Sequence, residues 1–331
     1  MRILRYCCLL CQLLMPAIAA GEGAGSLHLL VDVLWSPAEL AEQREDHART
    51  RSSDAPPSHM EPRVLLPPLP VEAIGNIRRV IPAQGDKPVA LTFDLCELAT
   101  RSSGYDAAII AYLRANDIPA TFFAGGKWLR SHRERGLQLM ADQRFELGNH
   151  AWTHGNFGIM DMQNMREQIL WTQAYYEDMR EELLTRARQK GIHAETLVAP
   201  SLRLFRMPYG RCSPTALRLL NSLGLRVIQW DVSGESVGDN SLPGIARNVA
   251  DKVRPGSILL FHANAVPKGS AALLAGVVPL LQQRGFRFVK VGELLDLGQP
   301  QRFQECFFKR PGDNLRYDTL FGVDGTGRRK P

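Results

Sequence analysis

Apolar runs of strand length alternate with longer amphipathic stretches between residues 82 and 297. Short runs rich in β-branched and aromatic residues are typical of buried strands, and the longer stretches have helical spacing. The predicted strands cover residues 88–94, 119–124, 145–150, 204–208, 226–232, 257–262 and 286–290. The predicted helices cover residues 105–115, 133–143, 161–189, 213–223, 242–253, 269–284 and 291–297, and Gly191, Gly224 and Gly285 follow three of them as stop signals. This regular alternation favours parallel strands joined by crossover helices, as in a β/α barrel.

Five of the apolar runs lead into residues that can do chemistry. These residues are Asp94, His150, Arg206, Asp231 and His262. Because the carboxyl ends of the parallel strands in a barrel converge on one mouth, we expect these five side chains to meet although they lie far apart in the sequence. The function is therefore expected at this mouth.

Residues 1–19 have the order of segments that is typical of a secretory signal peptide. Arg2 and Arg5 precede an apolar stretch at residues 6–18, and the small residues around Ala19 indicate cleavage there. The apolar stretch is shorter than the roughly 18 residues that a membrane span needs, although an uncleaved anchor stays open as the alternative. The mature protein is expected to be secreted or periplasmic, without a stable membrane span.

Three segments follow the predicted signal peptide. Residues 20–81 are polar and then Pro-rich, and the prolines between residues 67 and 70 favour an extended chain, so this stretch predicts a linker or tether. Residues 82–297 have a size compatible with one barrel domain. Residues 298–331 show little periodicity, and we expect this tail to lie along the domain or to be disordered.

The charge balance changes this picture little. The 331 residues include 40 Lys and Arg against 34 Asp and Glu, for a formal net charge of +6. No basic stripe interleaved with aromatic residues accompanies this excess, so we expect no nucleic-acid partner.

Removal of the predicted signal peptide leaves Cys96, Cys212 and Cys306 of the six cysteines. Three thiols cannot all pair, so an oxidising compartment permits one disulfide and leaves one thiol free or bound to a metal. Cys96 and Cys212 are both expected at the mouth of the barrel, which makes Cys96 the best placed partner for Cys212.

His150 and His154 lie four residues apart at the end of a predicted strand, and two imidazoles at this spacing can bind one metal ion. Asp94, at the end of another strand, would add a carboxylate. Two histidines and one carboxylate with an open coordination position form the ligand pattern of catalytic zinc and related divalent ions. We therefore expect a divalent metal cofactor, with zinc favoured.

The predicted domain resembles the polysaccharide deacetylase family, also called the NodB homology domain, whose members are metal-dependent carbohydrate esterases. Four motifs carry the resemblance in chain order: Thr92-Phe93-Asp94, His150 with His154, Arg206-Met207-Pro208-Tyr209 and Leu260-Phe261-His262. The resemblance implies a distorted (β/α)7 barrel that hydrolyses an N-acetyl or O-acetyl group on a sugar polymer.

The resemblance also implies a role for each matched residue: Asp94 as general base, Arg206 as the partner that keeps this base ionised, His150 and His154 as metal ligands, the backbone N–H of Tyr209 in the oxyanion hole, and His262 as general acid. Elementary chemistry agrees, because amide hydrolysis needs a nucleophilic water, a stabilised oxyanion and an acid for the leaving amine. A metal ion lowers the pKa of its bound water to about 7 and polarises the carbonyl.

Three further residues are expected to support the site from positions that flank the motifs. Asp231 would orient His262 as its protonated form develops, since it closes a neighbouring predicted strand. Trp152 and Trp230 would offer faces on which a sugar ring can stack.

The first motif departs from the family pattern, because Leu95 stands where typical members have a second, metal-binding Asp. A third ligand must complete the site, since two imidazoles alone rarely hold a catalytic ion. Strand alternation turns Leu95 away, so Asp94 itself is the first candidate, Glu97 the second and Cys96, which a disulfide would remove, the third. A subset of the family resembles this chain in having Asp-x-Cys in the first motif.

Two functions stay open. The first is a secreted, metal-dependent hydrolase that removes acetyl groups, N-acetyl rather than O-acetyl, from a cell-wall or exported polysaccharide. The second is a catalytically impaired glycan-binding protein on the same fold. His262 and Arg206 favour the enzyme, because a pure binding protein has no need for a general acid at the mouth.

Overall fold

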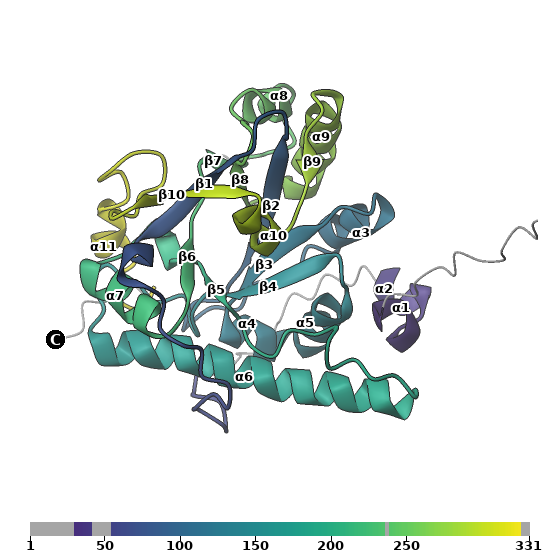
Figure 1. Cartoon of the computed structure of the whole chain (residues 1–331), viewed down its shortest axis with the longest axis vertical. Coiled ribbons are helices and arrows are strands. Elements are labelled where there is room, and N and C mark those ends of the chain that lie inside the picture. Colours follow the sequence, from purple (N-terminus) through teal and green to yellow (C-terminus); the bar gives the residue numbers. More distant parts are fainter. Residues whose placement is uncertain (1–29, 42–53, 236–237, 326–331) are drawn as a thin grey trace, which may run out of the picture.

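A curled, mostly parallel sheet forms the centre of the molecule in the computed structural model, which describes residues 30–41, 54–235 and 238–325 (Figure 1). The strand order is β10-β1-β6-β5-β4-β3-β2-β8-β7, and β9 pairs with β2. The mutually parallel strands are β1 (Asn76–Pro82), β2 (Pro88–Leu95), β3 (Ala120–Ala124), β4 (Phe145–Asn149), β5 (Leu204–Phe205), β6 (Arg226–Ile228), β7 (Val232–Ser233), β8 (Ile258–His262) and β9 (Arg287–Phe288). In this described part of the chain, β10 (Gly298–Phe303) is the strand that runs antiparallel, beside β1.

Helices cover the outer face of this sheet (Figure 1). They are α1 (Leu30–Leu34), α2 (Pro37–Ala41), α3 (Ala107–Ala115), α4 (Gly126–Ser131), α5 (Arg133–Ala141), α6 (Met162–Gln189), α7 (Pro214–Ser222), α8 (Ile245–Ala250), α9 (Ser270–Gln283), α10 (Val291–Asp296) and α11 (Arg316–Leu320), with 3-10 turns at Val71–Ala73 and Pro208–Gly210. Gly224 ends α7 with φ 74°, a conformation that costs glycine little, and its neighbour Leu225 donates to the Leu220 carbonyl. The predicted stop signals therefore lie where helices end.

The distorted (β/α)7 barrel that the sequence predicts is confirmed. All seven predicted strands are present, but three are markedly shorter than expected, and one of these is 286–290, where β9 covers only Arg287–Phe288. The stretch 204–208 keeps only β5, because Pro208 lacks an N–H and begins a 3-10 turn. The stretch 226–232 breaks after Ile228, and the chain pairs again only as β7, beside β8.

Side-chain alternation along β2 separates the core from the mouth. The strand is buried along its whole length, which is typical of a parallel strand covered on both faces. Phe93 and Leu95 join the core between sheet and helices, whereas Thr92 and Asp94 take the alternate positions that face inward. Asp94 pairs in register with His262 on the neighbouring β8, so two of the predicted site residues lie side by side.

Two strands come from the stretches that the sequence predicts as linker and tail. β1, at 76–82, pairs with β6 on one side and with β10, at 298–303, on the other. The sheet thus begins before residue 82 and continues past residue 297. The Pro-rich stretch before β1 has no strand between residues 64 and 70, as expected, and it runs along α6 and α7, where Leu69 donates to the Asn221 carbonyl. The predicted signal peptide lies outside the described residues.

The disulfide joins Cys212 to Cys306, so the expected pairing of Cys96 with Cys212 is wrong. Cys96 is the free cysteine among the described residues. The reason is β10, because its pairing with β1 carries the chain back over the mouth and brings Cys306 to Cys212. A cross-link that closes a loop of 94 residues removes denatured-state entropy equivalent to about 4 to 5 kcal/mol.

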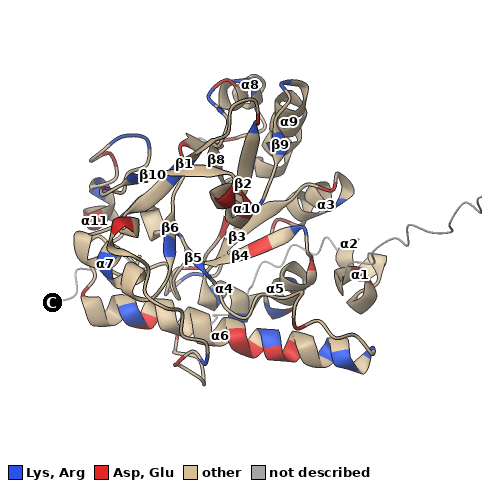
Figure 2. Ribbon diagram, in the orientation of Figure 1, with Lys and Arg blue, Asp and Glu red and all other residues tan. Residues whose placement is uncertain are grey.

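Positions of both charge signs occur along the ribbon, and they alternate most clearly along α6 (Figure 2). Arg186 of this helix binds Glu134 on α5 and Glu182 one turn away. Exposed pairs of this kind contribute at most about 1 kcal/mol each. Among the described helices, none is both long enough and apolar enough to cross a membrane.

Candidate metal and catalytic site

The site lies on the inner face of the barrel, where β2, β4, β5 and β8 reach their carboxyl ends. Asp94 is in β2, Arg206 follows β5 directly and His262 is the last residue of β8. His150 follows β4, and the turn after it carries His154. The structure therefore brings together every predicted motif residue except Asp231, which lies elsewhere.

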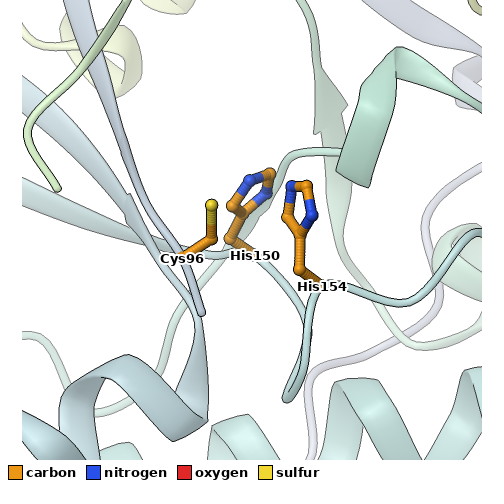
Figure 3. A group of neighbouring side chains, drawn as sticks. All are labelled: Cys96, His150 and His154. Atoms are coloured by element: carbon orange, nitrogen blue, oxygen red, sulfur yellow. The ribbon is translucent and has the colours of Figure 1, made fainter. Parts of the chain in front are cut away.

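Cys96, His150 and His154 form a compact group in which one ligand atom from each residue lies within 4.8 Å of the others. Figure 3 shows the sulfur and the two imidazoles pointing toward a common space. A set of one sulfur and two imidazole nitrogens suits a zinc ion.

The protonation state of His150 follows from its partner. Its Nδ1 lies 2.9 Å from the Arg206 carbonyl oxygen, and a carbonyl can only accept, so Nδ1 donates its proton. Burial lowers the pKa of His150, which keeps the ring neutral and leaves a lone pair on Nε2. That nitrogen is buried, has no hydrogen-bond partner among the described residues and lies 3.4 Å from Asp94 Oδ2. A lone pair facing a carboxylate oxygen is unfavourable unless a cation lies between or beside them.

His154 is also suited to bind a metal ion. Burial, followed by the neighbouring His150 and His262, lowers its pKa well below the usual value, so this ring is neutral too. Its Nδ1 is a second buried nitrogen without a hydrogen-bond partner in the described structure. Two neutral imidazoles with buried, unsatisfied nitrogens and an adjacent sulfur fit a divalent metal ion.

The turn that carries both histidines is held by Trp152. Ala151 and His154 have φ of 67° and 57°, a strained backbone for residues other than glycine. The indole of Trp152 is fully buried, and its Nε1 donates to the Asp54 carbonyl. Trp152 is therefore an anchor for the metal-binding turn, and the expectation that it offers a sugar-stacking face is wrong. Trp230 is only 2% exposed but lines the pocket that also contains Asp94, so a sugar contact there stays a prediction.

Asp94 and Arg206 form a buried ion pair, as predicted. Arg206 is fully buried and donates from Nη1 to Asp94 Oδ1 at 2.9 Å and to Thr92 Oγ1 at 2.8 Å. Its other nitrogens donate to the carbonyls of Ile228 and Gln229 at 3.2 and 3.3 Å. The pair leaves the second oxygen of Asp94 directed at His150 and able to accept a proton.

Glu235, rather than the predicted Asp231, orients His262. Glu235 Oε2 lies 2.6 Å from His262 Nδ1, and Oε1 accepts from the His262 backbone N–H at 3.0 Å. Burial lowers the pKa of His262, but the Glu235 charge and hydrogen bond outweigh burial, so the pKa is raised overall. The side chain is 30% exposed, so its proton is within reach of a bound substrate.

Asp231 lies at the opposite end of β8 because the strand that the sequence predicts up to this residue breaks early. Its carboxylate accepts from Ser257 Oγ and from the Ile258 N–H, at 2.9 and 3.0 Å, where β8 begins. His262 lies at the far end of the same strand, about 13 Å away along its length. The sequence pattern predicted no such role for Glu235, which lies two residues beyond β7.

The three candidates for the third ligand are in different surroundings. Glu97 turns away from the site and accepts from the Ser103 N–H and the Ser131 hydroxyl at 3.1 and 2.8 Å. Cys96 faces the histidines, and the Asn264 amide donates to its carbonyl and its sulfur at 3.1 and 3.5 Å. Burial, then Asp94 and Glu97, raises the pKa of the Cys96 thiol, whereas a bound divalent cation deprotonates a coordinating thiol. Asn264, two residues after His262, was not expected to have this role.

Tyr209 lies beside His154 at the mouth of the barrel. It occupies the 3-10 turn after β5 with φ 58°, and its ring lies 4.3 Å from that of His154. A pocket of about 190 Å³ is lined by Asp94, His154, Tyr209 and His262. A candidate base, a candidate acid and one of the two candidate metal-binding histidines thus share one cavity.

Comparisons with known proteins agree with this arrangement. Residues 82–228 match the family model described as polysaccharide deacetylase. The chain is 28% identical over 228 residues to a chitooligosaccharide deacetylase from Azorhizobium caulinodans, covering 65% of this chain and 97% of that protein. It is 25% identical over 216 residues to a peptidoglycan-N-acetylglucosamine deacetylase from Bacillus cereus, covering 65% and 70% of the two chains.

Solved structures with the same fold include a CE4 family pseudoenzyme from Bacillus anthracis, with a TM-score of 0.53 and 23% identity over 68% of this chain and 70% of that one. A peptidoglycan N-acetylglucosamine deacetylase has a TM-score of 0.52 and 22% identity over 70% and 97% of the two chains. At these identities the likeness supports the fold alone.

The Glu235 contact predicts how the pKa of His262 responds to substitution. Glu235→Gln removes the negative charge that stabilises the imidazolium, so the pKa of His262 should fall. NMR titration of the His262 imidazole measures this change. Asp231→Asn is the matched control and should leave the pKa nearly unchanged, because Asp231 lies at the other end of β8. An equal fall in both variants would contradict the assignment.

Proposed function

Because this chain belongs to the polysaccharide deacetylase family through the domain that carries the site, we propose that it is a secreted, metal-dependent hydrolase that removes acetyl groups from a cell-wall or exported polysaccharide. The relatives named for chitooligosaccharides and peptidoglycan act on N-acetylated sugars, which supports N-acetyl over O-acetyl groups as the target.

The observation that carries the proposal is the placement of three units around one cavity: the Cys96 and histidine group, the Asp94–Arg206 pair and the Glu235–His262 pair. The first has the donors for a cation, the second has a free carboxylate oxygen, and the third has a proton on an accessible imidazole. Amide hydrolysis needs a polarised carbonyl, a base and an acid on opposite sides of the scissile bond.

Each residue then has a defined task. A divalent ion bound at this site would acidify a water molecule and polarise the acetyl carbonyl. Asp94 would accept a proton from the attacking water, and Arg206 would balance the charge of the carboxylate. The Tyr209 backbone N–H donates to the oxyanion, and His262 gives its proton to the leaving amine while Glu235 stabilises the imidazolium.

The third metal ligand in this proposal is Cys96. It lies with His150 and His154 in one group, whereas Glu97 is hydrogen-bonded elsewhere and Asp94 is held by Arg206. A thiolate beside two imidazoles favours zinc over harder ions such as magnesium. Cys96, the third candidate from the sequence, is therefore our first choice as the ligand. Asp94, the first candidate, acts as the general base in this proposal.

Export is the remaining part of the proposal. The charged, apolar and small-residue segments of residues 1–19 have the order of a signal peptide. The Cys212–Cys306 disulfide supports an oxidising compartment such as the periplasm.

A glycan-binding protein that has lost catalysis is the alternative, motivated by Leu95 at the position of the usual second Asp. Such a protein would bind acetylated oligosaccharides without releasing acetate. The buried pairing of Glu235 with His262 favours the enzyme, because a carboxylate that raises the pKa of a histidine serves proton transfer rather than sugar binding.

The central prediction is release of acetate from N-acetylated sugar oligomers, abolished by a chelator and restored by added zinc. His262→Ala should lower the rate by roughly 100-fold or more while metal content stays unchanged, since this is the usual contribution of a positioned general acid. His150→Ala should lose the metal as well. The exposed His193 offers a control, His193→Ala, that should keep full activity. Oligomer binding without any acetate release by the wild-type protein would support the alternative instead.

Metal content separates the ligand candidates. Cys96→Ser should reduce bound zinc per protein strongly, whereas Asp94→Asn should retain zinc and lose at least about 100-fold of the rate. Elemental analysis of the purified variants measures the zinc, and Glu97→Gln serves as the neighbouring control that keeps it. Loss of zinc in Asp94→Asn with full zinc in Cys96→Ser would show that Asp94 is the ligand.

The mature protein from its native host is expected to begin near Ala20, because cleavage is predicted after Ala19. Mass spectrometry of the N-terminal peptide decides this. Recovery of an intact Met1 would count against cleavage.

A further inference from the structure

The tail that follows β10 lies across the mouth of the barrel and is fastened there at several points. This C-terminal segment, residues 304–325, is cross-linked to the third-motif loop by Cys212–Cys306. The Asn314 amide, fully buried, donates to the Gly210 carbonyl in the same loop. The segment lies beyond residues 82–228, which match the family model.

A second group of contacts joins the C-terminal segment to the loops that carry the site. Asp318 in α11 binds Arg211 through two hydrogen bonds of 2.9 and 2.7 Å and accepts from the Asn156 amide at 3.0 Å. The Asn156 backbone N–H donates to the Val323 carbonyl at 2.8 Å. These contacts place α11 over the turn after His154 and the turn after Tyr209.

Three aromatic side chains of the C-terminal segment form part of the catalytic cavity. Phe308, Tyr317 and Phe321 line the pocket of about 190 Å³ together with Asp94, His154 and His262. Phe321 stacks on Tyr209 at 4.6 Å, and Phe308 meets Trp230 edge-on at 5.2 Å. Part of the cavity wall is therefore built from the tail.

A larger hollow of about 640 Å³ adjoins this pocket, and the two share His262, Phe308 and Tyr317. Pockets that enclose drug-sized ligands measure about 300 to 1,000 Å³, so the inner pocket has room for an acetyl group and part of its sugar ring only. The rest of an oligosaccharide must then occupy the outer hollow. Tyr317 lines both cavities, at the place where an oligosaccharide would pass from the inner pocket into the outer hollow.

We propose that the C-terminal segment is a substrate-binding element and that Tyr317 is a specificity-determining residue, whose ring contacts the sugar unit next to the one that carries the acetyl group. The inference rests on the proposed function, since it places an acetylated oligosaccharide in the cavity. Tyr317 is half-buried, so its ring is accessible, and an aromatic face with a polar tip suits the apolar and hydroxyl-bearing faces of a sugar ring.

Kinetics on substrates of two lengths test the proposal. Tyr317→Ala should raise KM for an N-acetylglucosamine tetramer about tenfold, with kcat and zinc content unchanged, because only the neighbouring sugar unit loses its contact. KM for N-acetylglucosamine itself should change less than about twofold, since a monosaccharide has no neighbouring sugar unit for Tyr317 to contact. Tyr317→Phe keeps the ring and should restore KM for the tetramer. Leu320→Ala is the control, because Leu320 lies in the same helix, is 60% exposed and lines neither cavity.

Equal changes in KM for the two substrates, or no change for the tetramer, would overturn the proposal. A parallel fall of kcat and thermal stability in Tyr317→Ala, unrestored by Tyr317→Phe, would also overturn it, because that is the result of a purely structural role. If the wild-type protein releases no acetate, the proposed function fails and calorimetric binding of the tetramer becomes the test. About tenfold weaker binding by Tyr317→Ala then supports the inference, and equal binding or no binding by the wild-type protein rejects it.

Discussion

The buried guanidinium of Arg206 is the interaction on which the rest of the site depends. Its side chain binds Asp94 and Thr92 on β2 and two carbonyls at the end of β6, while its own carbonyl accepts from His150 Nδ1. One residue thus positions the base and fixes the tautomer of a histidine. An isolated charge could not remain here, because removing one partner of a buried ion pair costs about 3 to 5 kcal/mol.

The structure accounts for Leu95, which stands where typical family members have a metal-binding Asp. Leu95 belongs to the core between sheet and helices, so a carboxylate placed there on this strand would be buried among apolar side chains. The next residue, Cys96, leaves the strand and turns toward the histidines, where Asn264 supports its sulfur. In the proposed site, Cys96 would supply the third donor one residue later and as sulfur instead of oxygen, a set that favours zinc.

The mouth is completed by chain that does not belong to the alternating strands and helices. β1 and β10 form an antiparallel pair at one edge of the sheet, and this pair directs the tail back to the third-motif loop, where the disulfide holds it. A barrel scaffold leaves its loops free to vary, and in this protein the tail supplies part of the cavity wall.

The local sequence pattern was enough to predict most of the strands and helices and the positions of the motif residues. The seven strands, the helices and their glycine ends could be predicted because periodicity and stop signals are properties of neighbouring residues. The convergence of Asp94, His150, His154, Arg206 and His262 followed from the geometry common to parallel barrels. Only the tertiary structure decided what depends on partners distant in sequence: the break after Ile228 that separates Asp231 from His262, the contact of Glu235 instead, and the pairing of Cys212 with Cys306. Strand breaks and disulfides are settled by which chain segments pack together in space, and a linear pattern carries no such distances.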